Sequence, residues 1–348
     1  MKIAVYTIAL NEEQFVERWY ESAKDADYLV IVDTGSTDKT VEKAEALGIV
    51  CHTISVKPWR FDDARNAALA LLPDDVDYCI SLDMDEMLWV GWRAELEKLD
   101  PKVVTRPRYL YTWSWNEDGS PGVQFDGDHI HTRHGYRWRH PVHEALFPDR
   151  IQEVHQKIDL QLHHHPDQSK SRAQYLPLLQ QSTIEDPYND RNAFYYAREL
   201  YFYRMFPEAA VEFERYLNLP TATWVAERAA AYRYWARCEP SRTEELLQKS
   251  YEEDKLRRET MVDLAQYYHD KKDWLNSWNW ATTSLIIKEK PLDYLCEPYA
   301  WGATPHDLAA VAAFYQGDKK NAIIHGKHAL EIEPTNERLK SNLEFYNA

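Results

Sequence analysis

Short apolar runs alternate with helix-patterned segments through the first hundred residues. The first run is β-branched and apolar throughout, as in a strand buried on both faces, and the four runs cover residues 3–10, 28–32, 49–56 and 76–82. Segments with helical spacing of apolar residues separate them, at 15–22, 41–47 and 59–69. Because strand and helix alternate along the chain, the sequence predicts an α/β domain with a parallel sheet.

The fourth apolar run ends in two carboxylates, Asp83 and Asp85. Open α/β sheets bind ligands at the carboxyl ends of their strands. Two carboxylates placed there could share a hard divalent cation with phosphate oxygens, which is the D-x-D chemistry of sugar-nucleotide enzymes. A lone D-x-D is also compatible with an acidic loop after a strand, so the other motifs must decide between the two interpretations.

Two further motifs have both a structural and a functional interpretation. In the loop 33–38, Gly35 makes a turn and Ser36 or Asp38 caps a helix, but the loop also lies at a strand end beside a helix N-terminus, where a nucleotide can bind. Arg65 follows Asp62 by three positions on one helical face, so a surface ion pair is the alternative to a role at a diphosphate.

Beyond Leu99 the pattern changes to alternating, aromatic-rich segments at 103–115, 122–133 and 151–162, which predict antiparallel strands covering the site. Between them lies Glu144, a carboxylate that could take a proton from an acceptor near a D-x-D metal. The run 163–165, three histidines, ends the last of these strands and is placed to offer one metal ligand.

From Arg191 onward the sequence has no strand pattern, only paired amphipathic helices punctuated by prolines and charged turns. Residues 308–334 read as helix, Gly-Asp turn, helix and closing proline, which resembles a tetratricopeptide repeat (TPR). Helix starts near 191, 225 and 260 differ by about one such repeat length (~34 residues), and an insertion with two prolines disturbs the next repeat. The segment 337–346 is expected to form a capping helix, which covers the last apolar face of a repeat stack. Most of the Trp and Tyr residues here are expected to pack between helices.

Length and charge set limits on this interpretation. A chain of 348 residues accommodates two domains, and we expect a first domain at 1–168, a linker helix at 169–186 and a repeat domain at 187–348. The net charge of -16 makes nucleic acid an unfavourable partner. Four widely spaced cysteines without a C-x-x-C motif predict reduced thiols in a cytoplasmic protein. The apolar run that opens the chain is too short for a signal peptide, and no run approaches the length of a membrane span.

Taken together, the motifs of residues 1–168 resemble the family-2 type glycosyltransferases of the GT-A fold. The resemblance rests on the order and spacing of T-x-x-x-N-E (from Thr7), D-T-G-S-T-D (from Asp33), F-D-D-A-R-N (from Phe61), D-M-D-E (from Asp83) and V-H-E (from Val142). In that family the catalytic position more often reads E-D than H-E, which leaves His143 and Glu144 as alternatives for the base.

The resemblance implies roles for individual residues. Arg65 would approach the diphosphate, Asp85 would ligate the metal most directly, with Asp83 towards ribose or metal-bound water, and Mn²⁺ or Mg²⁺ is the expected cofactor. The late metal-binding histidine falls in the run 163–165, with His164 as the preferred alignment. The residues expected at the nucleotide sugar are Thr7, Ala9, Asn11, Glu12, Asp33, Thr34, Arg65, Asp83 and Met84.

These features predict a metal-dependent, inverting enzyme that moves a sugar from a UDP-sugar to an acceptor. Repeat domains hold proteins or mediate self-association, so a polypeptide acceptor and a homodimer through the repeats are expected, and a glycan or lipid-linked saccharide is the alternative acceptor. A non-catalytic scaffold would not need Asp83, Asp85 and Glu144. A nucleotidyltransferase would normally have a glycine-rich phosphate loop after the first strand, and residues 9–14 contain no glycine.

Overall fold

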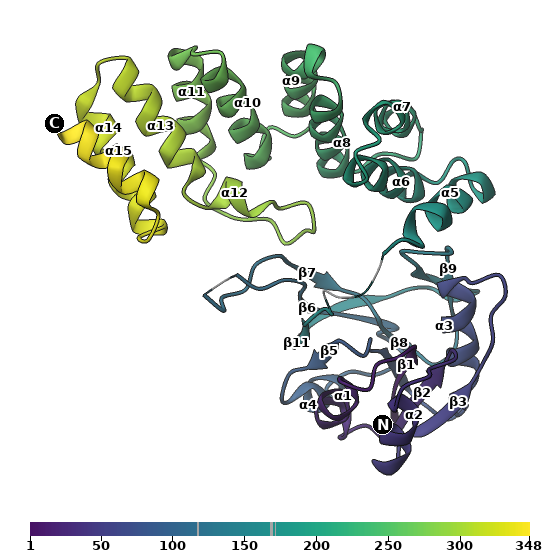
Figure 1. Ribbon diagram of the computed structural model, residues 1–348. Coiled ribbons are helices and arrows are strands. Elements are labelled where there is room, and N and C mark those ends of the chain that lie inside the picture. Colours follow the sequence, from purple (N-terminus) through teal and green to yellow (C-terminus); the bar gives the residue numbers. More distant parts are fainter. Residues whose placement is uncertain (117, 168–169, 171) are drawn as a thin grey trace. The chain divides into compact units, whose positions relative to one another are not determined.

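The computed structural model describes residues 1–116, 118–167, 170 and 172–348, which form two compact units, Met1–Ser182 and Thr183–Ala348. The division between them falls within helix α5 (Tyr175–Glu185). The first unit is α/β and the second is entirely helical in its described residues (Figure 1). This is the fold class that the switch from strand patterns to helix patterns predicts.

The central sheet of the first unit has the strand order β3-β2-β1-β4-β8. Strands β1 (Ile3–Ala9), β2 (Tyr28–Asp33), β3 (Val50–Thr53) and β4 (Tyr78–Ser81) pair in parallel, and β8 (Ile130–Thr132) is antiparallel to β4. Because the chain runs outward from β1 through β2 to β3 and then returns to β4 on the other side of β1, the topological switch point lies between β1 and β4. Ligands of open α/β sheets bind at that point, beyond the carboxyl ends of the strands.

Helices cover both faces of this sheet. Successive side chains of a strand point to opposite faces, so a strand that is apolar throughout presents apolar side chains to helices on either side. Ile3 and Val5 of β1 pack in one core cluster with Trp19, whereas Tyr6 packs in another with Leu69. The first cluster also receives residues of α1, α2 and α4, and the second receives residues of α3 (Figure 1). The helices are α1 (Val16–Ala23), α2 (Thr40–Ala46), α3 (Phe61–Ala70) and α4 (Trp92–Leu96).

A second sheet has the order β5-β11-β6-β7, and only β5 of its strands precedes residue 100. Its strands are β5 (Glu86–Leu88), β6 (Arg106–Thr112), β7 (Gln124–Gly127) and β11 (His155–His164). The prediction of uniformly antiparallel strands was wrong here: β11 pairs with β6 in parallel. The long connection between these two strands allows a parallel pairing, which a short hairpin would not.

The predicted strand at 122–133 was also wrong in its extent. That segment divides into β7 and β8, which belong to different sheets. The segment between β8 and β11 adds a small antiparallel pair, β9 (Tyr136–Arg139) and β10 (Ala145–Pro148). The chain therefore returns to the edge of the central sheet before it completes the second one.

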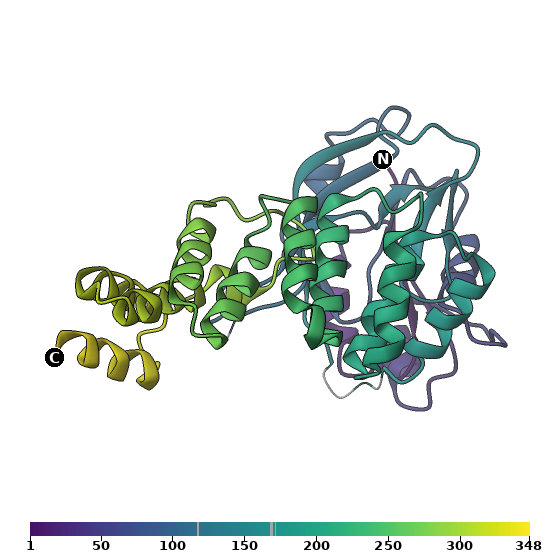
Figure 2. The same ribbon diagram turned by 90° about the horizontal axis from the view of Figure 1, so that it is seen from above.

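The second unit consists of consecutive helix hairpins, which follow one another along the unit in both views (Figures 1 and 2). The hairpins are α6–α7, α8–α9, α10–α11 and α13–α14, as in TPR proteins, and the terminal α15 packs on α14. The bounds are α6 (Asp190–Phe202), α7 (Phe206–Leu217), α8 (Val225–Cys238), α9 (Thr243–Glu253), α10 (Arg258–Asp270), α11 (Trp274–Ser284), α12 (Pro298–Trp301), α13 (Thr304–Tyr315), α14 (Lys319–Ile332) and α15 (Glu337–Asn347). A short 3-10 turn, η1 (Pro240–Arg242), precedes α9.

Three of the hairpin turns share one backbone conformation. Arg204, Lys272 and Gly317 each have positive φ between the two helices of a hairpin. Arg204 and Lys272 are separated by two repeat lengths of ~34 residues, and the insertion before α12 displaces Gly317 from this spacing. The helices that follow the second and third turns are capped by Asp273 and Asp318, whose side chains accept from the backbone N–H three residues later. The repeat therefore arises from a recurring turn as well as from recurring apolar positions.

Two observations concern the cysteines and the possibility of a membrane span. All four cysteines are free in the structure. Among the described residues, no helix combines the length and the apolar character needed to cross a membrane.

Candidate active site

The carboxyl end of β4 presents the D-M-D-E sequence next to the switch point. Met84 is 2% exposed and lies in the core, whereas the Asp83 side chain is 37% exposed. The predicted nucleotide-sugar contact of Met84 would thus have to use its backbone. Asp83 and Asp85 are the members of the motif that remain for ligand chemistry.

Arg65 occupies the space between Asp83 and Glu144. Its Nη1 donates to Ser81 Oγ at 3.0 Å and lies 2.8 Å from Asp83 Oδ1, Nη2 donates to Asp83 Oδ2 at 3.0 Å, and Nε donates to Glu144 Oε1 at 2.5 Å. Burial alone would raise the pKa of Asp83, but the Arg65 guanidinium outweighs burial and holds that pKa below its usual range. Asp62, the alternative partner considered from the sequence, instead accepts from Arg60. All three guanidinium nitrogens of Arg65 are thus occupied within the protein.

The rest of the F-D-D-A-R-N motif fixes α3 to the segment around β9. The backbone N–H of Phe61 donates to the carbonyl of Pro141 at 2.9 Å. Asn66 forms a reciprocal pair with the backbone of Trp138: Nδ2 donates to its carbonyl at 2.9 Å, and Oδ1 accepts from its N–H at 3.0 Å. These contacts hold the loop that carries V-H-E against α3, and they explain why residues far apart in the sequence converge.

The two alternatives for the base lie in different surroundings. The Glu144 side chain is 10% exposed, and Arg65 engages its Oε1. His143 has a positive φ of 49°, and its ring lies edge-on to Tyr175 with centroids 5.6 Å apart. Of the two, Glu144 is the residue joined through Arg65 to the D-x-D motif.

The three histidines at the end of β11 alternate in direction, because neighbouring residues of a strand face opposite sides. His163 and His165 both pack on Trp115. His164 lies on the other side, with Nε2 3.4 Å from Asp85 Oδ2. Its Nδ1 is 3.0 Å from the carbonyl of Trp113. A carbonyl can only accept, so Nδ1 carries a proton. Burial lowers the pKa of His164, but the Asp85 carboxylate outweighs burial and raises that pKa to about 9, so the ring is protonated beside Asp85. A cation bound there would displace the proton on Nε2.

The fit of a divalent cation follows from this pair. Among the described residues, no group of three or more His, Cys, Asp or Glu side chains is arranged to hold a metal ion. Asp85 and His164 could supply one oxygen and one nitrogen, and a carbonyl that fixes the tautomer of a metal-binding histidine is a common supporting contact. Mg²⁺ and Mn²⁺ sites in nucleotide enzymes often use few protein ligands and take the remainder from phosphates and water. The residues present fit such a site.

The first loop and the D-T-G-S-T-D loop are joined to each other. Asn11, with a positive φ of 56°, accepts through Oδ1 from the backbone N–H of Thr37, and its own N–H donates to Ser36 Oγ. Asp33 accepts from the backbone N–H groups of Gly35 and Ser36. The structural interpretation of this loop therefore applies to Asp33 and Asn11, which shape the loop whether or not a nucleotide binds there.

The other residues expected at the nucleotide sugar are mostly buried. Thr7 and Ala9 are 0% and 3% exposed, and Thr34 Oγ1 donates to the carbonyl of Ala9 at 3.0 Å. Glu12 Oε1 pairs with Lys170, and burial raises the pKa of Glu12 more than Lys170 lowers it. Any contact of Thr7 or Ala9 with a ligand would be made by the backbone.

Glu86 is a residue to which the sequence reasoning gave no role. It is 3% exposed, accepts from Tyr111 Oη at 2.7 Å and from the backbone N–H of Asp83 at 2.9 Å, and so fixes the turn of the D-M-D loop. Burial, with Asp83 next, raises the pKa of Glu86 to about 8. The signal in the sequence was its place directly after D-M-D, but nothing there showed that its side chain would be buried.

Comparisons with known proteins identify this region. The family model "Glycosyl transferase family 2" matches residues 4–99. An uncharacterized glycosyltransferase of Rickettsia bellii (strain RML369-C) is 36% identical over 98 residues, which are 28% of this chain and 32% of the relative. The chain thus matches about a third of the length of that curated relative. The family model therefore matches the region whose motifs predicted a family-2 type glycosyltransferase.

Solved structures match each unit separately and only in part. Glucosyl-3-phosphoglycerate synthase from Mycobacterium tuberculosis, in a complex with Mn²⁺ and UDP, is 26% identical with a TM-score of 0.27, covering 32% of this chain and 44% of that chain. A thermophilic TPR protein of Thermus thermophilus is 13% identical with a TM-score of 0.33, covering 49% of this chain and 88% of that chain. The fold described above rests on the strand order and the helix hairpins themselves.

Proposed function

We propose that the protein is a metal-dependent glycosyltransferase that moves a sugar from a UDP-sugar to an acceptor with inversion at the anomeric carbon. The observation that carries the proposal is the approach of His164 Nε2 to Asp85, 3.4 Å apart, at the carboxyl end of β4 within a family 2 glycosyltransferase domain. Inversion is what the family resemblance implies for direct attack by an activated nucleophile.

The metal site would consist of Asp85 and His164, with Asp83 held aside by Arg65. Mn²⁺ or Mg²⁺ bound there would supply positive charge against the departing diphosphate. The Asp83 side chain is 37% exposed, so its carboxylate could still contact ribose or a metal-bound water. This division of roles agrees with the order in which the family motif uses its two aspartates.

Glu144 would act as the base. Arg65 engages Oε1, so Oε2 is the atom that would accept the acceptor proton. The same guanidinium bonds to Asp83, and a single rigid group thus sets the position of the base relative to the D-x-D loop. His143, with its ring against Tyr175, is the alternative base.

The helical unit is proposed to serve the acceptor. Helix-hairpin repeats hold proteins or mediate self-association, so a polypeptide acceptor and a homodimer through this unit are proposed, and a glycan or lipid-linked saccharide is the alternative acceptor.

A panel of UDP-sugars incubated with Mn²⁺ and no acceptor tests the proposed activity. We expect slow, EDTA-sensitive release of UDP from one member of the panel, with saturable binding of that donor. UDP release that persists in EDTA, or a panel in which no donor is bound or hydrolysed, would contradict the proposal.

A further inference from the structure

Arg18, in the first half of α1, has a guanidinium without the partners that Arg65 has. Its Nε and Nη2 atoms are buried, and no described residue forms a hydrogen bond with them. The guanidinium carbon lies 4.8 Å from the centroid of the Phe15 ring, which holds the side chain in place without satisfying its donors. A buried donor that lacks a partner is costly, so the site is arranged for an acceptor from outside the described chain.

Arg18 is one of the residues that line a pocket of about 660 Å³ in the first unit. The walls include Phe15, Trp113, Trp115 and His165. The volume is in the range of small-molecule sites, and a few polar groups among aromatic walls are typical of them. Asp167, a carboxylate in the lining, accepts from Gln14 Nε2 at 2.7 Å.

The pocket adjoins the proposed metal ligands. The backbone N–H of His165, one of its walls, donates to the carbonyl of Asp85 at 2.8 Å, and Trp113 supplies the carbonyl next to His164 Nδ1. Burial lowers the pKa of Arg18, and the Asp85 carboxylate is the charge that opposes this effect. Arg18 therefore lies within electrostatic range of Asp85.

We propose that this pocket is the diphosphate subsite of the donor and that Arg18, not Arg65, is the arginine that binds the diphosphate. The inference rests on the proposed function. Arg65 was expected in this role, but its nitrogens are occupied by Ser81, Asp83 and Glu144. Arg18 lines the pocket, and its buried Nε and Nη2 donors form no hydrogen bond with a described residue. A guanidinium matches phosphate oxygens in geometry as well as in charge.

The charge changes of the reaction give Arg18 a role in turnover as well as in binding. The bond between the anomeric carbon and the β-phosphate oxygen breaks with its electron pair left on that oxygen, while the acceptor nucleophile bonds to the carbon and its proton passes to Glu144. The diphosphate thereby gains one negative charge, and hydrogen bonds from a fixed guanidinium become stronger as that charge develops.

The test compares binding of UDP, inorganic pyrophosphate and uridine to the full-length chain in Mn²⁺ by calorimetry. Arg18→Gln is expected to weaken UDP and pyrophosphate by about 10- to 100-fold, the scale of a hydrogen bond to a charged group, and to leave uridine unchanged. Arg18→Lys keeps the positive charge but loses the paired donors of the planar guanidinium, so its affinities for UDP and pyrophosphate should lie between those of Arg18→Gln and the native protein. Lys24→Gln removes an exposed positive charge from the end of the same helix and should change none of the three affinities.

The outcomes separate this inference from the proposed function. Native protein that binds no UDP would overturn both. Native protein that binds UDP in Mn²⁺, with unchanged UDP and pyrophosphate affinity in Arg18→Gln, would overturn the inference alone. If Arg18→Gln kept its UDP affinity but raised the KM for the acceptor, the arginine would bind an anionic acceptor group, which also contradicts the assignment. Thermal unfolding of each variant shows whether the fold is retained, and Arg18→Lys gives the same comparison if Arg18→Gln does not fold.

Discussion

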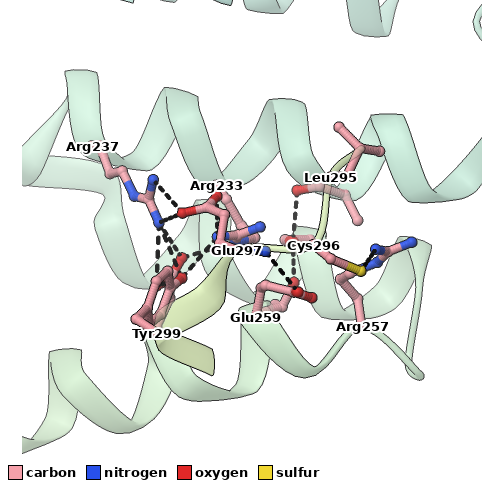
Figure 3. A network of polar contacts seen from close by, with 12 residues as sticks. Arg233, Arg237, Arg257, Glu259, Leu295, Cys296, Glu297 and Tyr299 are labelled. Carbon is pink, nitrogen blue, oxygen red and sulfur yellow. Dashed lines mark hydrogen bonds and ion pairs between the residues drawn. The ribbon is translucent and has the colours of Figure 1, made fainter. Parts of the chain in front are cut away.

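Each unit of the molecule contains a buried arginine among carboxylates, and only one of the two networks lies at a candidate site. In the α/β unit, Arg65 bonds to Asp83 and Glu144. In the helical unit, Arg233 is 1% exposed and pairs with Asp263. It also bonds to Glu297 and Tyr299 (Figure 3). In both, burial lowers the pKa of the arginine, but its partners outweigh burial and hold that pKa well above its ordinary value: Asp83 and Glu144 at Arg65, and Tyr299 followed by the carboxylates at Arg233.

The helical network joins elements of the fold to each other. Figure 3 shows Arg233 and Arg237 of α8 directed towards Glu297 and Tyr299, at the end of the insertion that leads into α12. Glu259 of α10 completes the connection, since its Oε1 accepts from the backbone N–H of Glu297 at 3.1 Å. This network anchors the insertion that interrupts the repeat.

The difference between the networks lies in what surrounds them. Asp83 is 37% exposed, beside Asp85, at the carboxyl end of a parallel strand, whereas Asp263 is 15% exposed on a helix between helices. Buried ion pairs and shifted pKa values occur in both, so these features alone do not identify an active site. The position at a switch point, the approach of His164 to Asp85 and the adjoining pocket distinguish the candidate site of the α/β unit from the helical network.

Asp85→Asn should have the largest effect on function and little effect on the fold. The side chain is 21% exposed and the change is nearly isosteric, so unfolding should remain cooperative while metal-dependent UDP binding and turnover are lost. Asp126→Asn, in an exposed pair with Lys157 of the same unit, is the control. Turnover at the native level with added Mn²⁺ would remove Asp85 from the metal site.

Arg233→Met should show the opposite pattern. Removing one partner of a buried ion pair leaves the other charge uncompensated, so we expect a loss of about 3–5 kcal/mol in the free energy of unfolding. UDP affinity of the folded fraction should not change. Arg242→Met breaks an exposed pair with Glu245 and should alter stability little. Chemical denaturation gives the stability, and a loss of UDP affinity at full folding would mean that the helical network supports the donor site.

Glu144→Gln is expected to lower transfer by about 10²-fold or more, the usual scale for a lost general base. The amide oxygen can still accept from Arg65, so donor affinity should be retained. Calorimetry of donor binding beside turnover separates the two effects. If His143→Ala shows this behaviour and Glu144→Gln does not, the base is His143.

A fragment that ends at Ile184 should show the smallest change in UDP binding. The proposed donor residues all belong to the first compact unit, Met1–Ser182, so a soluble fragment should bind UDP with metal as the full chain does. Transfer to the acceptor should be poor. The solubility of the fragment must be checked first, because uncovered repeat surfaces often aggregate. Equal transfer by the soluble fragment and the full chain would mean that the helical unit is not the acceptor platform.

The sequence predicted the parts of the fold that depend on local pattern. The ends of β1, β2 and β4 follow from apolar runs, and the repeats follow from helical spacing and turn residues. The parallel pairing of β6 with β11 could not be read in this way, because register across a long connection depends on the tertiary structure. Local pattern also could not show that β8 would join the central sheet.

The candidate site was predictable in its motifs and not in its hydrogen bonds. The alternation of residues along a strand explains why His164 lies beside Asp85 while His163 and His165 pack on Trp115. The partners of Arg65 and the unsatisfied nitrogens of Arg18 depend on which side chains become buried together. That is a property of packing, which the spacing of residues along the chain does not contain.

The most direct test of the account is the affinity of the full-length chain for UDP in Mn²⁺ and in EDTA. If Asp85 and His164 hold a cation that binds the diphosphate, UDP should bind at least about tenfold more tightly with Mn²⁺, and Asp85→Asn in Mn²⁺ should behave as the native protein does in EDTA. Equal affinity of the native protein with and without Mn²⁺, or no UDP binding under either condition, would contradict the central claim.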